Sequence, residues 1–181
     1  VLSVIDHLRN SYRPITSVMV PAKGDPHWRQ VPFTAGARTL PGLVVYRFAG
    51  GIYYANANHL VEDLVGIVEQ GEEAGDPVRW LCLDAVVIDD VDYSGGEALR
   101  QIHGALADHH VRFVIAEPLP QVQDLLDRYG LTELFGQDAV YATLSDAVAD
   151  FRATADVGAT TDAGDDTDTI QTTDAPEDAT P

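Results

Sequence analysis

The sequence predicts an α/β domain, in which helices cover a β-sheet, and three observations lead to this prediction. Runs of β-branched and aromatic residues at Leu43–Phe48, Val78–Leu83 and Val111–Ala116 are typical of buried strands. Between these runs, apolar residues recur every three or four positions, which is the spacing of amphipathic helices. Gly, Pro, Asp and Asn separate the segments. Because strands that alternate with helices form layered α/β architectures, we expect parallel pairing in the sheet.

Residues 1–14 are predicted to form a short linker helix that leads into the domain. Apolar residues at helical spacing extend to Leu8, Arg9 and Arg13 follow, and Pro14 ends the helix. Two interpretations remain open at this point. The segment is either an ordinary amphipathic terminus or a stretch that leaves a membrane on its cytoplasmic side, where Lys and Arg are favoured.

The next region is predicted to be mostly irregular. Pro and Gly residues interrupt Ile15–Gln30, which favours a loop, with a short edge strand over His27–Val31 that Pro32 closes. After Leu43–Phe48, two glycines break the chain. We expect Ile52–Ala55 to be a short second strand or a bulged continuation of the first.

The caps of the following helices can be placed from single residues. Asn56 or Asn58 is expected to cap a helix, because the side-chain oxygen of Asn accepts hydrogen bonds from helix N–H groups. Pro118 or Pro120 is expected to open a later helix. Gly130 is the stop signal of that helix.

The C-terminal part is predicted to contain a last short strand, a last helix and a tail. The strand covers Ala139–Ala142, and Ser145 caps a helix that reaches Phe151 or slightly beyond. Residues 155–181 consist mainly of Thr, Asp, Ala and Gly, so we expect a disordered acidic tail. The predicted organisation is therefore a linker (1–14), a domain (15–154) and a tail (155–181).

The stretch Leu83–Leu99 joins a strand to a helix through a turn with several carboxylates. Ser94 and Glu97 have the spacing of a capping box, in which each side chain binds the backbone N–H of the other residue. We therefore expect the helix to begin at Ser94. A hydroxyl at the positive end of a helix suits an anion or a phosphoryl group, so Ser94 is also a candidate phosphorylation site.

Composition excludes several classes of protein. The net charge is −18, and residues 51–154 carry five Lys or Arg against nineteen Asp or Glu, which argues against nucleic-acid binding. Cys82 is the single cysteine, so no internal disulfide can form, and we expect it to be a small buried hydrophobe. No apolar run approaches the roughly 18 residues that span a bilayer. The chain begins with Val rather than Met, which indicates a piece of a longer protein.

Familiar catalytic patterns are absent from the sequence. It contains neither a Walker-type phosphate loop nor the Gly-x-Ser-x-Gly motif of hydrolases. The six histidines do not have metal-ligand spacing. Asp89, Asp90 and Asp92 could hold a hard cation, but we favour solvated turn carboxylates near a helix N-terminus, and expect no metal site.

Two blocks of the sequence resemble a known family. Asp92-Tyr93-Ser94-Gly95-Gly96, with a strand before and a helix after it, is similar to the Asp-x-Ser/Thr-Gly turn of the STAS domain. Sulfate permease (SulP) anion transporters and bacterial anti-sigma factor antagonists share that domain. The segment 41–57, PGLVVYRFAGGIYYANA, resembles the SulP version of its first block. Arg13-Pro14 looks like the linker that follows the last membrane span.

The resemblance implies a mixed sheet flanked by helices. It further implies a non-catalytic regulatory or assembly domain of a sulfate transporter, on the cytoplasmic face of the cell membrane. Its expected partners are the transmembrane domain of its own transporter, a second copy or a regulatory protein. The alternative is a soluble anti-sigma factor antagonist that is switched by serine phosphorylation at Ser94.

The resemblance also implies a site. Ser94 matches the phosphorylated serine of the antagonists, and no catalytic residue is expected. No cofactor is required, but some STAS domains bind nucleotides. A guanine or adenine nucleotide would here contact Asp92, Tyr93, Ser94, Gly95 and Gly96.

Overall fold

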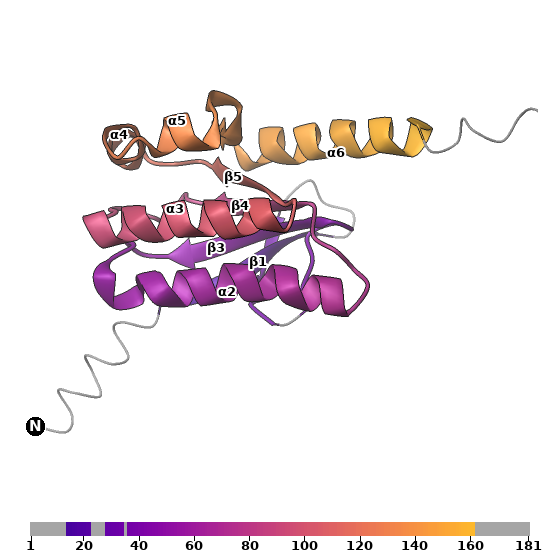
Figure 1. The fold of residues 1–181 in the computed structure, drawn as a ribbon, viewed down its shortest axis with the longest axis horizontal. Helices are drawn as coiled ribbons and strands as arrows, with labels where there is room; N and C mark the ends of the chain where they lie inside the picture. The colour runs from indigo at the N-terminus through magenta and orange to yellow at the C-terminus, as the bar shows by residue number, and fades with distance from the viewer. Residues whose placement is uncertain (1–13, 23–27, 35, 162–181) are drawn as a thin grey trace, which may run out of the picture.

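The computed structural model describes residues 14–22, 28–34 and 36–161 and shows six strands and five α-helices there (Figure 1). The expected linker helix and residues 162–181 of the expected tail lie outside the described residues, apart from Pro14. The elements are β1 (Ile15–Pro21), β2 (Trp28–Pro32), β3 (Leu43–Ala49), α2 (Tyr54–Glu73), β4 (Trp80–Asp84), α3 (Tyr93–Asp108), β5 (Arg112–Ala116), α4 (Pro120–Arg128), α5 (Leu131–Phe135), a 3-10 turn (Gln137–Ala139), β6 (Val140–Tyr141) and α6 (Leu144–Thr161).

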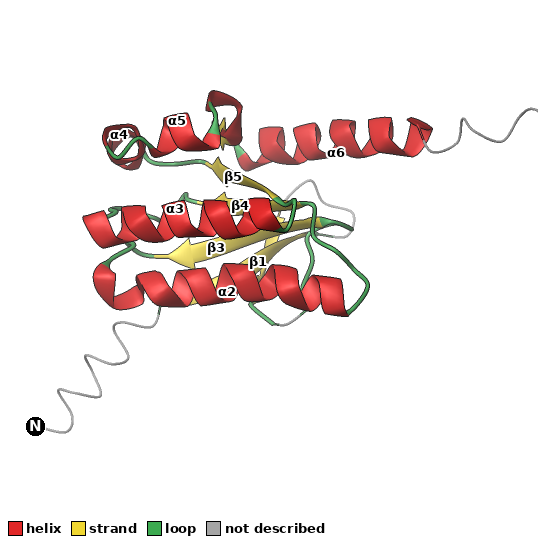
Figure 2. Ribbon diagram, viewed as in Figure 1, coloured by secondary structure: helices red, strands yellow, loops and turns green. Residues whose placement is uncertain are grey.

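The strands form one mixed sheet in the order β2-β1-β3-β4-β5-β6 (Figure 2). β1 runs antiparallel to both β2 and β3, whereas β3, β4, β5 and β6 are parallel. Connections through α2, α3 and α4–α5 separate the parallel strands, as parallel pairing requires. The predicted mixed sheet flanked by helices is therefore confirmed.

Alternation along the strands divides the core between the two faces of the sheet. Val44, Tyr46 and Phe48 of β3 are fully buried in a cluster with the apolar stripes of α2, α3 and α4. Leu43 and Val45 point to the opposite face, where α6 supplies the covering apolar residues. Figure 1 shows α2 and α3 side by side on one face of the sheet.

Several predicted elements are confirmed. Leu43–Phe48 is β3 with one added residue, and Pro120 is the first residue of α4. Gly130 follows that helix with a φ of 68°, a left-handed conformation that glycine adopts readily. Cys82 is 1% exposed, as expected of a buried apolar residue. None of the helices in the described part of the chain is long and apolar enough to cross a membrane.

Two strand predictions were wrong. Ile15–Pro21 forms β1, an inner strand, although the Pro and Gly residues nearby favoured a loop. Pro21 ends this strand rather than interrupting it, and β1 gains hydrogen bonds from neighbours distant in sequence. Ile52–Ala55 is not a strand, because only Ile52 forms a bridge and the helix already begins at Tyr54.

The helix caps predicted for α2 and α6 were also wrong. Asn56 lies inside the first turn of α2, where its Oδ1 accepts a hydrogen bond from Tyr53 N–H (2.8 Å), and Asn58 is deeper in the helix. At α6 the capping oxygen is Thr143 Oγ1, which accepts from Asp146 N–H (3.1 Å), not that of Ser145. α6 extends to Thr161 and so includes the first residues assigned to the tail.

Candidate functional site

The turn between β4 and α3 lies beside the segment between β3 and α2. Ile52 N–H donates to the carbonyl of Asp90 (2.9 Å), and Asp92 N–H donates to the carbonyl of Ile52 (3.0 Å). These bonds form a short parallel bridge between Ile52 and Val91. The bridge holds the N-termini of α2 and α3 next to each other at the carboxyl-end edge of the sheet.

One carboxylate serves both helix N-termini. Asp92 is the N-cap of α3, and its Oδ1 accepts a hydrogen bond from Gly95 N–H (2.7 Å). Its Oδ2 accepts a second bond from Tyr54 N–H (3.0 Å), the first residue of α2. Asp92 thus neutralises the positive ends of two helices at once, which suits an anionic side chain.

This geometry contradicts the predicted capping box of Ser94 and Glu97. α3 begins at Tyr93, so Ser94 is the second helical residue and cannot cap. Glu97 faces Arg100 instead, at 3.5 Å between Oε1 and Nε. The prediction failed because Asp92 is an equally good capping residue two positions earlier, and the Ile52 bridge fixes the backbone there.

The two glycines of the turn are required by packing. A Cβ on Gly95 would collide with the backbone carbonyl of Ile52, and a Cβ on Gly96 would lie 2.9 Å from Tyr129 Cδ2. Both glycines are buried. Of the five residues expected to contact a nucleotide, only Tyr93 and Ser94 therefore offer accessible side chains that are not already bonded in the cap.

An open groove of about 470 Å³ runs between the first turns of α2 and α3. Tyr54 and Tyr93 are 81% and 72% exposed on its walls, and Ser94 is partly exposed between the helices. The groove is lined by Tyr54, Ala57, Asn58, Tyr93, Ser94, Glu97, Ala98, Arg100 and Gln101. Tyr54, Asn58, Arg100 and Gln101 were not identified from the sequence as site residues. Their signal was the spacing of three or four residues, from Tyr54 to Ala57 and Asn58 and from Glu97 to Arg100 and Gln101, which places them on one face of each helix.

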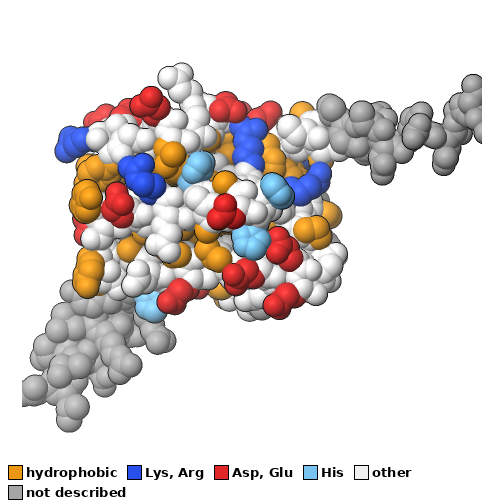
Figure 3. Space-filling view, in the orientation of Figure 1, with side chains coloured by type: hydrophobic (Ala, Val, Ile, Leu, Met, Phe, Trp, Pro, Cys, Tyr) orange, Lys and Arg blue, Asp and Glu red, His pale blue; other side chains and the backbone are white. Residues whose placement is uncertain are grey.

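Carboxylates lie near this groove. Figure 3 shows acidic side chains spread over the face formed by α2 and α3. Asp90 Oδ1 accepts from Val91 N–H (2.9 Å), and burial together with Asp90 and Asp89 raises the pKa of Tyr53. No group of three or more potential metal ligands occurs among the described residues. In the structure, Asp90 and Asp92 thus bond backbone N–H groups of the turn.

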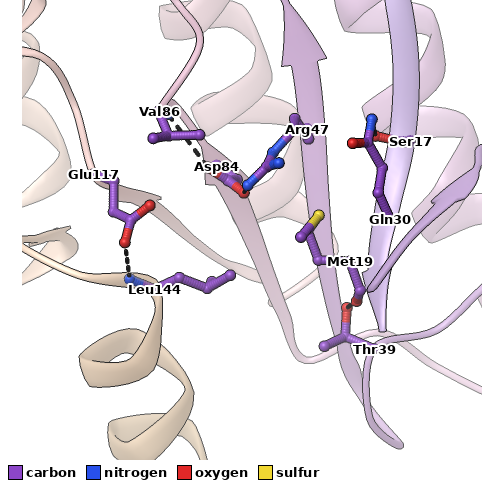
Figure 4. A network of polar contacts seen from close by, with 9 residues as sticks. All are labelled: Ser17, Met19, Gln30, Thr39, Arg47, Asp84, Val86, Glu117 and Leu144. Atoms are coloured by element: carbon purple, nitrogen blue, oxygen red, sulfur yellow. Dashed lines mark hydrogen bonds and ion pairs between the residues drawn. The ribbon is translucent and has the colours of Figure 1, made fainter. Parts of the chain in front are cut away.

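A second polar cluster lies at the same sheet edge, on the face that α6 covers (Figure 4). Arg47 at the end of β3 donates to Asp84 at the end of β4, with 2.8 Å from Nε to Oδ2. Asp84 is fully buried, and burial raises its pKa while Arg47 opposes that shift. Glu117, after β5, accepts from Leu144 N–H (3.2 Å) at the start of α6. These contacts join the end of β3 to the end of β4, and the end of β5 to the start of α6.

Comparisons with known proteins agree with this architecture. The profile of the STAS domain family matches residues 35–147. High affinity sulfate transporter 1 of Stylosanthes hamata is 28% identical over 144 residues, which is 77% of this chain and 22% of the transporter. Sulfate transporter 1.2 of Arabidopsis thaliana is 28% identical over 141 residues, 75% of this chain and 22% of that protein. The chain thus spans about a fifth of the length of these relatives.

Solved structures share the fold at lower identity. SLC26A9 aligns with a TM-score of 0.67 and 17% identity over 88% of this chain and 27% of that chain. The SulP transporter STAS domain from Vibrio cholerae aligns with a TM-score of 0.53 and 22% identity, over 68% of this chain and 91% of that one. The anti-sigma factor antagonist SpoIIAA aligns with a TM-score of 0.53 and 17% identity, over 65% of this chain and 94% of that one. The family match covers more than half of the sequence and the fold agrees with it, so the chain belongs to the STAS domain family.

Proposed function

We propose that this chain is the cytoplasmic regulatory and assembly domain of a SulP-type sulfate transporter, without catalytic activity of its own. The observation that carries the proposal is the similarity to sulfate transporters over three quarters of the chain. The anti-sigma factor antagonist shares the fold at 17% identity, which supports the architecture alone. The transported anion would pass through a membrane domain, and the STAS domain would bind to that domain at the cytoplasmic face of the cell membrane.

The position of β1 supports this assembly. Ile15, the first residue of β1, pairs with Ala49 at the carboxyl end of β3, which is also the edge that carries the α2–α3 groove. A preceding membrane domain would therefore join on the same side as the groove. Exposed apolar side chains gather on the elements of this edge: Ile15 (72%), Val87 (42%), Tyr54 (81%) and Tyr93 (72%). Large exposed aromatic residues of this kind are typical of protein–protein interfaces.

Ser94 is the residue at which we propose regulation by phosphorylation. A phosphate on Ser94 would enter a groove that Arg100 also lines. Arg100 makes a long contact with Glu97 and donates a hydrogen bond from Nη2 to the carbonyl of Tyr129 (2.9 Å). The new dianion would compete with Glu97 for that guanidinium and would gain from the N-terminus of α3, but it would be repelled by Asp92. The expected result is a rearranged groove rather than an unfolded domain.

A nucleotide is the second ligand that we propose for the groove. Tyr54 and Tyr93 expose ring surfaces on which a guanine or adenine base could stack. On α3, the side chains that line the groove and could donate to its phosphates are Ser94, Arg100 and Gln101. Such a nucleotide would be a regulator and not a required cofactor.

A transport assay tests the assembly. The complete reading frame that contains this chain is expressed in a sulfate-uptake-deficient host, and uptake is compared between the wild type and a Tyr54→Ser/Tyr93→Ser variant. We expect reduced uptake at an unchanged amount of protein in the membrane, with Arg128→Gln on α4 as a control that retains uptake. Equal uptake by the tyrosine variant would contradict the proposed interface, and a reading frame without membrane spans would favour the soluble antagonist.

Phosphorylation is tested separately. The purified domain is treated with kinase-containing lysate and labelled ATP, and the incorporated phosphate is compared between the wild type, Ser94→Ala and Ser145→Ala. Ser145 is a matched exposed serine near the start of α6. Loss of label in Ser94→Ala alone supports the switch, whereas label that persists in Ser94→Ala places the modification elsewhere.

A further inference from the structure

The sheet edge opposite the groove carries arginines and aromatic rings, here called the arginine edge: Arg79 and Arg112 with the rings of Trp80 and Phe151, together with Arg152, the neighbour of Phe151 in the sequence. Arg79 precedes β4 and Arg112 begins β5, and Arg112 N–H donates to the carbonyl of Arg79 (2.9 Å). Arg152 follows Phe151 on α6. Figure 3 shows basic side chains beside hydrophobic atoms near the base of α6.

The arginines and rings form an alternating stack. The guanidinium carbon of Arg112 lies 4.3 Å from the centre of the Trp80 ring, and that of Arg79 lies 5.2 Å from the Phe151 ring. The two rings meet edge to face, with centroids 5.7 Å apart. The stacking holds Arg79 and Arg112 in place, so little side-chain entropy would be lost if they bound an anion.

The arginine edge has spare capacity for an anion. Arg79 and Arg152 are exposed, and neither has an ion-pair partner among the described residues. Arg112 is half-buried and binds Asp138, with 2.7 Å between Nη2 and Oδ2. Because guanidinium groups carry several N–H donors in a fixed fork, each can bind a carboxylate in addition to the ring on its face.

α6 leads the chain to this edge. The helix starts near Glu117 at the carboxyl edge of the sheet, crosses to Phe151 against Trp80 and continues to Thr161. In Figure 1 it extends to the right beyond the ends of α2 and α3. The last ten residues of the helix cover about 15 Å. The following 20 residues can extend to roughly 66 Å, so they can return to the arginine edge.

The composition of residues 162–181 is complementary to that edge. The segment contains seven Asp or Glu and no Lys or Arg. Residues 51–154 are themselves strongly acidic, so most of the surface that they form repels the segment. The arginine edge is a local exception on that surface.

We propose that the acidic segment 162–181 docks on the arginine edge of its own domain. Its carboxylates bind Arg79 and Arg152, while Arg112 keeps its contact with Asp138 and stabilises the stack. High salt, or a competing polyanion, displaces the segment from the edge.

Paramagnetic labelling of the full chain tests this docking. Cys82 is buried and does not compete for a thiol reagent, so Ile170→Cys provides a single nitroxide position within the acidic segment. Amide resonances of Arg79 and Arg112 are expected to broaden, while those of Tyr54 and Ser94 at the opposite edge stay sharp. In about 1 M NaCl, where the Debye length is about 3 Å, the broadening should be lost.

Charge variants of the same labelled chain give the decisive comparison. Arg79→Gln/Arg152→Gln should lose the broadening, whereas Arg128→Gln, a matched exposed arginine at the end of α4, should retain it. The triple variant Asp165→Asn/Asp166→Asn/Asp168→Asn should also lose the broadening. Broadening that is equal at both edges, or that persists in the double arginine variant, overturns the proposal. So does broadening that appears only between two differently labelled copies, since that would mean docking in trans.

Discussion

Substitutions at Asp92 and Ser94 distinguish the capping arrangement in the structure from the one expected from the sequence. Asp92 Oδ1 and Oδ2 each accept a backbone hydrogen bond, from Gly95 and from Tyr54, at the starts of α3 and α2. The hydroxyl of Ser94 makes no hydrogen bond to the described residues. Asp92→Ala should therefore destabilise the domain, and Ser94→Ala should be nearly neutral.

The expected magnitudes follow from these contacts. Loss of an N-cap costs about 1 kcal/mol, and loss of the charge at two partly exposed helix ends adds about 0.5 kcal/mol for each, so Asp92→Ala should cost about 2 kcal/mol. Asp92→Asn keeps one acceptor oxygen but turns an N–H donor toward the other helix, so it should cost about 1 kcal/mol. Ser94→Ala should stay within about 0.5 kcal/mol of the wild type.

Urea unfolding followed by circular dichroism and tryptophan fluorescence measures these free energies. The three variants should share the wild-type m-value and differ only in midpoint. If Ser94→Ala costs as much as Asp92→Ala, the assignment of Asp92 as the cap of α3 is wrong. If Asp92→Asn equals the wild type, the second bond to α2 contributes nothing.

Further predictions concern a glycine pair, a buried carboxylate and the cysteine. Gly95→Ala should destabilise by about 2 kcal/mol or more, because its Cβ meets the carbonyl of Ile52, whereas Gly104→Ala on α3 meets nothing and should stabilise by about 0.5 kcal/mol. Burial raises the pKa of Asp84 above its ordinary 3.8, so the folded chain holds this proton to higher pH than the unfolded chain. The wild type should therefore lose stability relative to Asp84→Asn as the pH rises above about 4. Burial also raises the pKa of the Cys82 thiol, which should react with a thiol reagent only as fast as the domain unfolds.

Each of these predictions can be tested by a direct measurement. Urea midpoints of the two glycine variants should move in opposite directions, and a shift in the same direction would contradict the packing argument at Gly95. The free energy of unfolding of Asp84→Asn minus that of the wild type should increase as the pH rises. A difference that stays constant or decreases would refute the predicted direction. Rapid modification of Cys82 under native conditions would show that its environment is open.

The elements that could be predicted are those whose signal is local. The β-branched run at Leu43–Phe48, the Pro120 start and Gly130 stop of α4, and the apolar setting of Cys82 are determined by residues within a few positions of one another. β1 could not be identified in this way. Its hydrogen-bond partners lie in β2 and β3, and the nearby prolines hid its alternating pattern.

The sequence by itself determined the alternation of strands and helices, the position of the turn at Asp92–Gly96 and the acidic character of the chain, because propensity, periodicity and charge are properties of neighbouring residues. Only the tertiary structure decided which residues cap the two helices and line the groove at that turn. The Ile52–Val91 bridge places Tyr54 beside Asp92, although 38 positions separate them in the chain. That proximity makes Asp92 a shared cap, buries both glycines against groups distant in sequence, and brings two exposed tyrosines to one groove. Such contacts depend on residues far apart in the chain, so no local sequence pattern contains this information.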